Sequence, residues 1–262
     1  MIFNIKTKPT ITLTTLILVF FLSSLKSYAG WYECYNFSGT INKIPITFSI
    51  QVKDGYFGEK DKKDLNLIGV YKYDHENEPI LLEGKLNFKS SKALLYEMRN
   101  GKRAALFEFQ FAKAQCDGVW KNLNDNKKLA LHLNYINNLI DTTDTSEFHD
   151  VEILQSNSLK DLYFIGIYSK KDGESRAHMD KLKIINKKDN TVKQIIDFRN
   201  VASQTGNIWT IIYGNVQIAN AKTNELEIWN SIGRMGGLLS VKFNFSTQKF
   251  KLNPIPKNNG PG

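Results

Sequence analysis

Proline is scarce in this chain of 262 residues, which holds six prolines and 17 glycines. Together with 42% hydrophobic and 23% charged residues, this content excludes a disordered chain and a collagen-like repeat. It is typical of a folded globular protein. The length allows either one large β domain or two smaller ones, each able to bury a core.

Catalytic and metal-binding motifs are also missing from the sequence. There is no Gly-x-Ser-x-Gly or Ser-x-x-Lys motif, and neither His75 nor His132 has a nucleophile paired with it. The EF-hand loop, the His-Glu-x-x-His zinc motif and the P-loop are absent as well. We therefore expect no enzyme activity, no cofactor and no metal site.

The longest apolar run lies at the N-terminus, where two lysines precede the segment Leu13–Leu25. This run is shorter than the roughly 20 residues that span a bilayer. Small residues at Ser27 and Ala29 fit the cleavage rule of a secretory signal peptide. Residues 1–29 are thus predicted to be removed before Gly30, with an uncleaved anchor as the alternative. Export predicts a periplasmic protein without stable membrane insertion, or a secreted one where the host lacks an outer membrane.

Basic residues outnumber acidic ones by 35 to 26, which gives a formal net charge of +9. Three of the lysines lie in the signal segment, which leaves +6 on the mature chain. The remaining basic side chains alternate with acids, as in Lys60-Asp61-Lys62-Lys63-Asp64. A charge so diluted does not predict nucleic-acid binding, although it suits an anionic partner or the envelope surface.

Apolar residues alternate with polar ones from residue 31 to about residue 136, which predicts a β-meander. The loops are too short for crossover helices, so neighbouring strands must pair antiparallel, and such a sheet avoids exposed edges by closing. Residues 30–140 are predicted to form a small antiparallel up-and-down β-barrel. Its strands are expected at Trp31–Thr40, Ile44–Val52, Leu65–Tyr73, Pro79–Phe88, Ala93–Met98, Ala104–Phe111, Cys116–Lys121 and Lys127–Leu133.

A polar linker at residues 141–149 is predicted to lead into a second antiparallel β-rich domain at residues 150–252, followed by a flexible tail at residues 253–262. The fold class is therefore all-β. A helix over Gly173–Lys181 competes with the strand pattern. The strands are expected at Asp150–Leu154, Leu162–Tyr168, Lys181–Asn186, Thr191–Phe198, Trp209–Tyr213, Val216–Ala221, Glu225–Asn230, Leu238–Phe245 and Lys249–Leu252.

The two cysteines, Cys34 and Cys116, fall on the first and seventh predicted strands. In an oxidising compartment they are expected to form a disulfide. Closing a loop of about 82 residues would contribute about 4 kcal/mol. Two free buried thiols are the alternative.

Potential metal ligands gather in the polar linker and just after it, at Asp141, Asp144, Glu147, His149 and Asp150. Their spacing fits no known metal loop, so a solvated linker is the simpler interpretation.

Glu83, Glu97 and Glu108 lie in β-patterned segments, and a glycosidase needs only two carboxyl groups. In an antiparallel barrel, however, a water-facing glutamate is the default. His178 and Asp180, two positions apart, share one side of a strand and could form an acid/base pair. A surface histidine is the simpler interpretation there.

A glycine-rich connection, Ser231-Ile232-Gly233-Arg234-Met235-Gly236-Gly237, carries one cation between two predicted strands. Its backbone N–H groups could converge in a nest, and Arg234 offers two donors to a carboxylate or phosphate. Gly233, Arg234, Gly236 and Gly237 are therefore candidate binding residues. An ordinary long hairpin with glycines at positive φ is the alternative.

The first half carries a series of short β motifs: Phe37–Ile41, Ile44–Phe48, Gly69–Tyr73, Ile80–Gly84, Leu95-Tyr96-Glu97 and Gly118-Val119-Trp120. They resemble segments of secreted proteins of Gram-negative bacteria, some of which look like periplasmic lysozyme inhibitors. The resemblance implies a β-module followed by a calcium-binding, propeller-like body. Calcium is not expected here, because Asn215–Ala221 holds no carboxylate where those proteins have their calcium loop.

These observations predict an exported, non-catalytic binding protein with a protein partner in the cell envelope. The resemblance suggests that the partner is a cell-wall hydrolase, with Arg234 placed against a catalytic carboxylate. One alternative is a barrel that holds a small apolar ligand in its lumen. A glycan-active enzyme, with two acids about 5 to 10 Å apart in a cleft, is another.

Overall fold

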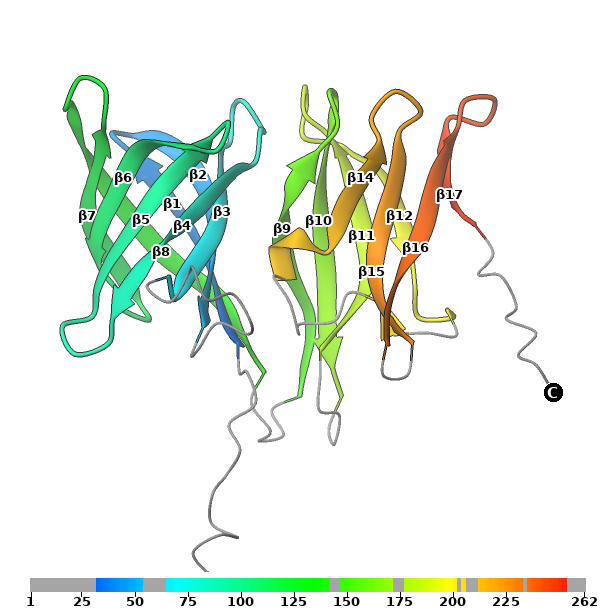
Figure 1. The fold of residues 1–262 in the computed structure, drawn as a ribbon, viewed down its shortest axis with the longest axis horizontal. Coiled ribbons are helices and arrows are strands. Elements are labelled where there is room, and N and C mark those ends of the chain that lie inside the picture. Colours follow the sequence, from blue (N-terminus) through cyan, green and yellow to red (C-terminus); the bar gives the residue numbers. More distant parts are fainter. Residues whose placement is uncertain are drawn as a thin grey trace, which may run out of the picture.

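The computed structural model describes residues 32–53, 65–141, 147–171, 177–201, 204–205, 212–232 and 235–253. Strands make up all the regular structure in these ranges except η2 (Ile212–Gly214), a short 3-10 helix. They form a closed barrel and, beside it, two further antiparallel sheets (Figure 1). The all-β prediction is confirmed. The predicted signal segment and most of the predicted tail lie outside the described residues.

Eight strands form the barrel, each pairing antiparallel with the next, and β1 closes the ring by pairing with β8. The strand β8 runs well past the predicted end at Leu133, because its second half continues the ladder with the start of β1, as far as Tyr32 opposite Asp141. The strands are β1 (Tyr32–Ile41), β2 (Ile44–Lys53), β3 (Leu67–Tyr73), β4 (Ile80–Asn87), β5 (Lys92–Arg99), β6 (Lys102–Gln110), β7 (Gln115–Asn122) and β8 (Lys128–Asp141).

The barrel interior is a packed core of aromatic and aliphatic side chains. The rings of Phe48, Tyr71 and Phe107 lie with their centroids 5.0 to 6.3 Å apart, mostly tilted or edge to face. Neighbouring strands approach closely at Gly84, where a Cβ atom would lie 1.8 Å from the carbonyl oxygen of Leu94. The two strands therefore leave no room for a side chain at Gly84.

The second half of the chain contains two antiparallel sheets. The first is a meander of β9 (Phe148–Ser158), β10 (Leu162–Lys170), β11 (His178–Asn186) and β12 (Val192–Asp197). The second contains β13 (Gln204–Thr205), β14 (Val216–Asn220), β15 (Glu225–Ile232), β16 (Met235–Asn244) and β17 (Lys249–Leu252).

Two local predictions differ from this part of the structure. Residues 178–181, which the competing helix would include, are strand, and residues 172–176 lie outside the described ranges. The strand predicted at Trp209–Tyr213 is not seen at its described end, since Ile212 and Tyr213 belong to η2. The chain turns there into β14, and Asn215 donates to the hydroxyl of buried Tyr168 at 2.8 Å.

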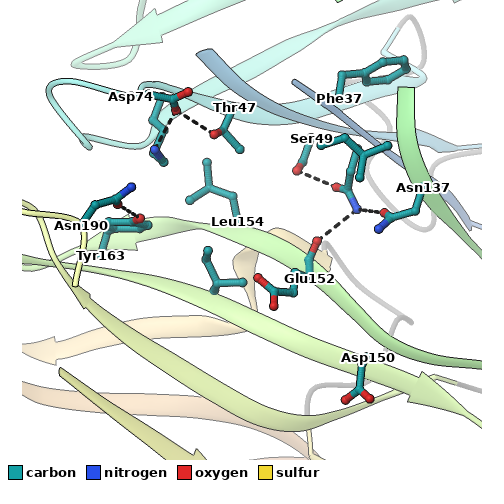
Figure 2. Close-up of a pocket in the computed structure, with 14 residues that line it drawn as sticks. Phe37, Thr47, Ser49, Asp74, Asn137, Asp150, Glu152, Leu154, Tyr163 and Asn190 are labelled. Atoms are coloured by element: carbon teal, nitrogen blue, oxygen red, sulfur yellow. Dashed lines mark hydrogen bonds and ion pairs between the residues drawn. The ribbon is translucent and has the colours of Figure 1, made fainter. Parts of the chain in front are cut away.

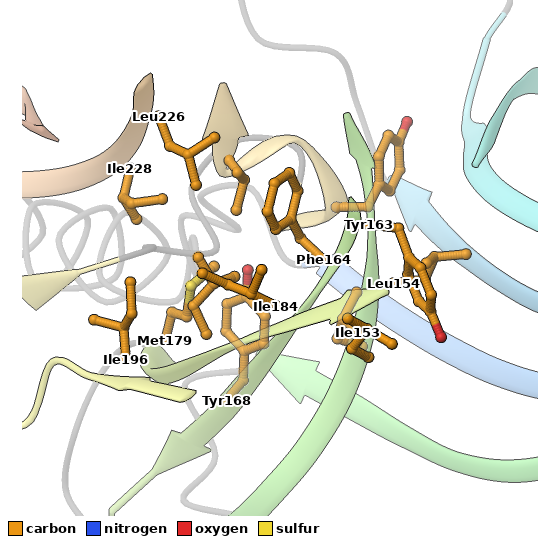
Figure 3. Packing of buried hydrophobic residues seen from close by; sticks show 14 of the residues in the cluster. Ile153, Leu154, Tyr163, Phe164, Tyr168, Met179, Ile184, Ile196, Leu226 and Ile228 are labelled. Carbon is orange, nitrogen blue, oxygen red and sulfur yellow. The ribbon is translucent and has the colours of Figure 1, made fainter. Parts of the chain in front are cut away.

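Side-chain amides bridge the edges of these two sheets. Gln194 of β12 donates to the carbonyl of Phe250 in β17 and accepts from its N–H, both at 2.8 Å. At the opposite edge, Asn157 of β9 donates to the carbonyl of Val216 in β14 at 2.8 Å. Between the sheets lies a hydrophobic core (Figure 3), which includes Ile153, Phe164, Ile184, Leu226 and Ile228.

The barrel shares this second core through its outer wall. Cys34 and Leu139, which lie opposite each other on β1 and β8, belong to the same buried cluster as Ile153 and Leu154 of β9. Ile68 and Val70 of β3 complete the contact from the barrel side. A continuous apolar interface therefore joins the two halves.

The disulfide prediction is wrong: the structure has two separate buried cysteines. On β1, Tyr35 and Phe37 face the barrel interior, so Cys34 points the other way, into the core shared with β9. Cys116 packs inside the barrel with Leu131 and Leu133. The wall of the barrel thus lies between the two thiols.

Candidate functional site

A cavity of about 560 Å³ lies where the outer wall of the barrel meets the sheet of β9 to β12 (Figure 2). Strands β1, β2, β3 and β8 line one side, and β9 and β10 line the other. Its volume falls within the range of about 300 to 1,000 Å³ that is typical of ligand sites. Junctions between structural units are also a preferred place for such sites. We call this cavity the inter-sheet cleft.

A β-bulge in β8 places one group of polar side chains at the cleft. On β1, Asn36 lies opposite Asn137 and Phe37 opposite Tyr135, so Ile136 is the extra residue. Before the bulge, Tyr135 packs against the barrel interior, and after it Asn137 lies on the outer wall. Without the extra residue, the alternation of the strand would send Asn137 into the barrel.

Asn36 is the centre of a hydrogen-bond network on this wall. Its Nδ2 donates to Oδ1 of Asn137 at 2.7 Å and to the carbonyl of Glu152 at 3.0 Å. Its Oδ1 accepts from the hydroxyl of Ser49 at 2.7 Å. Because Glu152 lies on β9, this one buried amide ties the barrel to the neighbouring sheet.

A second group of polar side chains surrounds Lys72, which is only 3% exposed. Its ammonium donates to Oδ1 of Asp74 and to Oδ1 of Asn77, both at 2.8 Å. Thr47 donates to the same oxygen of Asp74 at 2.7 Å, and Asn77 donates to the carbonyl of Lys187 at 2.8 Å. The buried charge is thus paired and hydrogen-bonded, as burial requires.

The opposite side of the cleft carries charge pairs as well. Glu152 forms an ion pair with Lys183, and Asp150 lies 3.5 Å from Lys181. All three carboxylates of the lining, including Asp74, therefore have a lysine partner.

Tyr163 lines the same side of the cleft. The centre of its ring lies 5.2 Å from the Lys72 ammonium, and its hydroxyl donates to Asn190. Burial, followed by the negative charges of Asp74 and Glu152, raises the pKa of Tyr163 to about 12. Tyr163 therefore stays neutral at physiological pH, as a donor to Asn190.

Of the glycine-rich residues predicted as a binding site, Gly236 and Gly237 do not line this cleft. Gly236 and Gly237 belong to β16, opposite Ser231 and Asn230 of β15. Gly233 and Arg234 lie outside the described residues. Since β15 ends at Ile232 and β16 begins at Met235, most of the predicted connection is strand.

The predicted glutamates have different surroundings. Glu97 is buried, not water-facing as the default predicted, because it lies on the inward side of β5. There it accepts from Tyr71 at 2.5 Å, and its other oxygen pairs with Arg99. Glu108 is exposed and pairs with Lys92 at 2.5 Å, while Glu83 is half-buried. The structure does not bring these three glutamates together at the cleft.

The histidine and linker candidates lie apart from one another. His178 and Asp180 sit on one face of β11. His149 contacts Glu147 at 2.7 Å, both side chains being exposed, and Asp150 lines the cleft. No group of three or more potential metal-ligating side chains occurs within the described ranges. Asp144 is outside those ranges.

Sequence analysis missed the inter-sheet cleft, although one signal for it was present. The segment from Leu67 to Lys72 is buried throughout, because β3 faces the barrel core on one side and β9 on the other. Its nearly unbroken apolar sequence, Leu-Ile-Gly-Val-Tyr, indicates a strand covered on both faces.

Comparisons of the chain with family models, with curated proteins and with solved structures gave no match. The resemblance to periplasmic lysozyme inhibitors therefore stays a prediction.

Proposed function

We propose that this protein is an exported, non-catalytic binding protein and that the inter-sheet cleft is its ligand site. The observation that carries the proposal is a cavity of about 560 Å³ whose polar side chains are held in place by a buried network across two structural halves. Fixed hydrogen-bonding groups at a preformed cavity are what recognition requires.

The arrangement of charge favours binding over glycoside hydrolysis. A glycosidase needs a carboxyl group that gives its proton to the leaving oxygen. In the cleft, Asp74, Glu152 and Asp150 each face a lysine ammonium, so they act as acceptors in charge pairs. The packed aromatic interior of the barrel likewise favours the cleft over a lumen site.

Hydrogen–deuterium exchange of the mature chain tests this proposal with mixtures in which the ligand need not be identified. The chain is incubated with the small-molecule fraction and, separately, the protein fraction of an envelope extract. We expect the backbone around Ser49 and Glu152 to gain protection with one fraction. The variant Ile136→Trp should abolish that gain, because Ile136 lines the cleft and is 54% exposed.

Ile195→Trp is the matched control, since Ile195 is 50% exposed and does not line the cleft. It should behave as the unmodified chain does. Equal protection in both variants, or none with either fraction, would show that the cleft is not the ligand site.

A second candidate function, inhibition of a cell-wall hydrolase, is supported by the outer face of the second sheet. Trp229 of β15 and Leu238 of β16 lie directly opposite each other there and are 38% and 45% exposed. They belong to the two paired strands that flank the candidate binding residue Arg234 in the sequence. Tryptophan and arginine are enriched among the residues that dominate protein–protein binding.

This candidate is tested by adding the mature chain to a purified lysozyme that is digesting cell walls. We expect stoichiometric inhibition that Trp229→Ala and Arg234→Ala weaken and that Ile195→Ala leaves intact. Full digestion at excess chain, or inhibition equal in all variants, would exclude Trp229 and Arg234 as parts of an inhibitory surface.

A further inference from the structure

We propose that the inter-sheet cleft binds a neutral saccharide. This inference rests on the proposed function, because it takes the cleft as the ligand site and names the class of ligand. Four features of the lining carry it: unused acceptors, unused donors, balanced charge and an apolar surface.

The unused acceptors are carboxylate oxygens. Both bonds to Asp74, from Thr47 and Lys72, end on Oδ1, and Lys183 bonds Oε1 of Glu152. Within the described part of the chain, Oδ2 of Asp74 and Oε2 of Glu152 therefore keep their capacity to accept. Figure 2 shows these two side chains on opposite sides of the cleft. Each oxygen suits a hydroxyl group that donates.

The unused donors are side-chain amides. Asn137 uses its Oδ1 to accept from Asn36, and Asn190 uses its Oδ1 to accept from Tyr163. Among the described residues, no acceptor is bonded to the Nδ2 group of either side chain. Because its oxygen is fixed by the network, each amide has a defined orientation and presents N–H groups to an incoming acceptor.

Charge balance favours an uncharged ligand over one that is recognised by its charge. The three carboxylates face three lysines, and Lys72 cannot turn toward an anion without losing Asp74 and Asn77 inside a buried site. An unpaired opposite charge at a site favours the capture of a cation or an anion. An uncharged molecule that both donates and accepts is the chemistry that remains, and the hydroxyl groups of a sugar do both.

The lining also offers apolar surface. Ile136, Leu154 and Ile165 line the cleft together with the polar groups. The C–H faces of a pyranose ring can pack against such aliphatic side chains while its hydroxyls reach the edges.

The first experiment compares three ligands that share one ring and differ in charge. N-acetylglucosamine is neutral, glucosamine is a cation and glucuronate is an anion. A panel of neutral mono- and disaccharides is measured in parallel by ligand-observed NMR and calorimetry on the mature chain. We expect binding by neutral members and at least about tenfold weaker binding by the charged analogues of the same ring, which is about 1.4 kcal/mol.

The second experiment removes one donor at a time. Asn137→Asp and Asn190→Asp keep the oxygen that accepts from Asn36 or Tyr163 and replace only the Nδ2 group. Each should weaken saccharide binding about fivefold, the loss expected for one hydrogen bond. Asn134→Asp makes the same charge change on the exposed side of β8, outside the cleft, and should leave binding unchanged.

The outcomes separate the two proposals. If no neutral saccharide binds, or if glucosamine binds best and Asp74→Asn abolishes its binding, the saccharide inference is overturned. If the envelope extract still protects the backbone of the cleft from hydrogen–deuterium exchange, the cleft remains supported as a binding site for another ligand. If saccharides bind but neither donor variant weakens them, the inference also fails, because the contacts lie elsewhere.

Discussion

The two halves of this molecule close their sheets by different means. In the barrel, backbone hydrogen bonds continue around the whole ring, and β1 pairs with β8 along ten residues of β1. In the second half, strands of separate sheets meet at their edges, and side chains such as Gln194 and Asn157 make the bonds between them. Closure by backbone removes all edges, whereas bridging by amides protects edges that still exist.

The inter-sheet cleft lies between the closed barrel and the first of the two bridged sheets. The barrel contributes a rigid wall of continuous strands, and the second half contributes β9, which is an edge strand of its sheet. An edge strand has room to receive a partner on its open side. The bond from Asn36 to the carbonyl of Glu152 shows the barrel using that side.

The largest expected effect is a loss of stability when one methyl group is added to a glycine, and it should differ between the two halves. Gly84→Ala would press a Cβ atom against the backbone of Leu94, which is fixed in the barrel ladder. At Gly166, in β10, the nearest atoms belong to side chains, Tyr168 at 2.6 Å and Met179 at 2.9 Å, which can move. We expect a loss of about 3 kcal/mol or more for Gly84→Ala and about 1 kcal/mol for Gly166→Ala, measured by urea unfolding.

Gly101→Ala is the control for this pair. No atom lies within 4 Å of a Cβ there, so only the positive φ of 72° opposes the change. If Gly84→Ala loses no more unfolding free energy than Gly101→Ala, the backbone of the barrel can shift to accommodate a Cβ atom as easily as side chains can.

The barrel could be predicted from the sequence because its evidence is local. Each strand alternates, and each turn is short, so antiparallel neighbours follow from the order of the chain. The same argument gave the position of Cys34 on its strand but not the face it occupies. Facing depends on which side of β1 is covered by β9, a contact between residues more than 100 positions apart.

The cleft escaped prediction for the same physical reason. Asn137 faces the cleft because of a bulge at Ile136, and nothing in the local sequence separates a bulged strand from a regular one. The partners of Asn36 and Asn77 include backbone carbonyls of Glu152 and Lys187, and a backbone carbonyl has no sequence signature.

The second prediction tests the amide bridge. Gln194→Ala removes both bonds to the backbone of Phe250 and leaves a strand edge unsatisfied. We expect a loss of about 2 kcal/mol and a greater tendency to associate, measured by urea unfolding and light scattering. The control is Gln110→Ala on the barrel, where the lost bond to the carbonyl of Ser90 is exposed to water. Equal stability of the two variants would mean that the sheets need no bridge.

At alkaline pH, a buried tyrosine of the cleft and one of the barrel should each make the stability of the protein depend on pH. Tyrosine in an unfolded chain titrates near pH 10, whereas burial raises the pKa of Tyr163 to about 12 and that of Tyr71 further, with Glu97 adding to the effect. The unfolded state thus loses protons first, and stability falls as the pH rises above about 10.

Tyr163→Phe should remove part of that fall between about pH 10 and pH 12, because phenylalanine has no proton to lose. Tyr71→Phe should begin to act at the same pH, where the unfolded tyrosine ionises, and should continue to act above about pH 12, because the pKa of Tyr71 is raised further. Tyr96→Phe, on the half-buried outer wall of the barrel, serves as control. The measurement follows tyrosinate absorbance together with circular dichroism. An effect of Tyr71→Phe that ends near pH 12, as that of Tyr163→Phe does, would contradict the stronger rise in the pKa of Tyr71.

The smallest expected effect is no effect at all, and it concerns the thiols. A disulfide that closes a loop of about 82 residues would contribute about 4 kcal/mol, so a reductant would lower the unfolding midpoint by many degrees. Since Cys34 packs in the core shared by both halves and Cys116 inside the barrel, we expect the midpoint to stay unchanged. Thiol titration should find two reactive groups per unfolded chain with no reductant added. A midpoint that falls on reduction would mean that the two cysteines are paired, and that Cys34 does not pack in the core shared with β9.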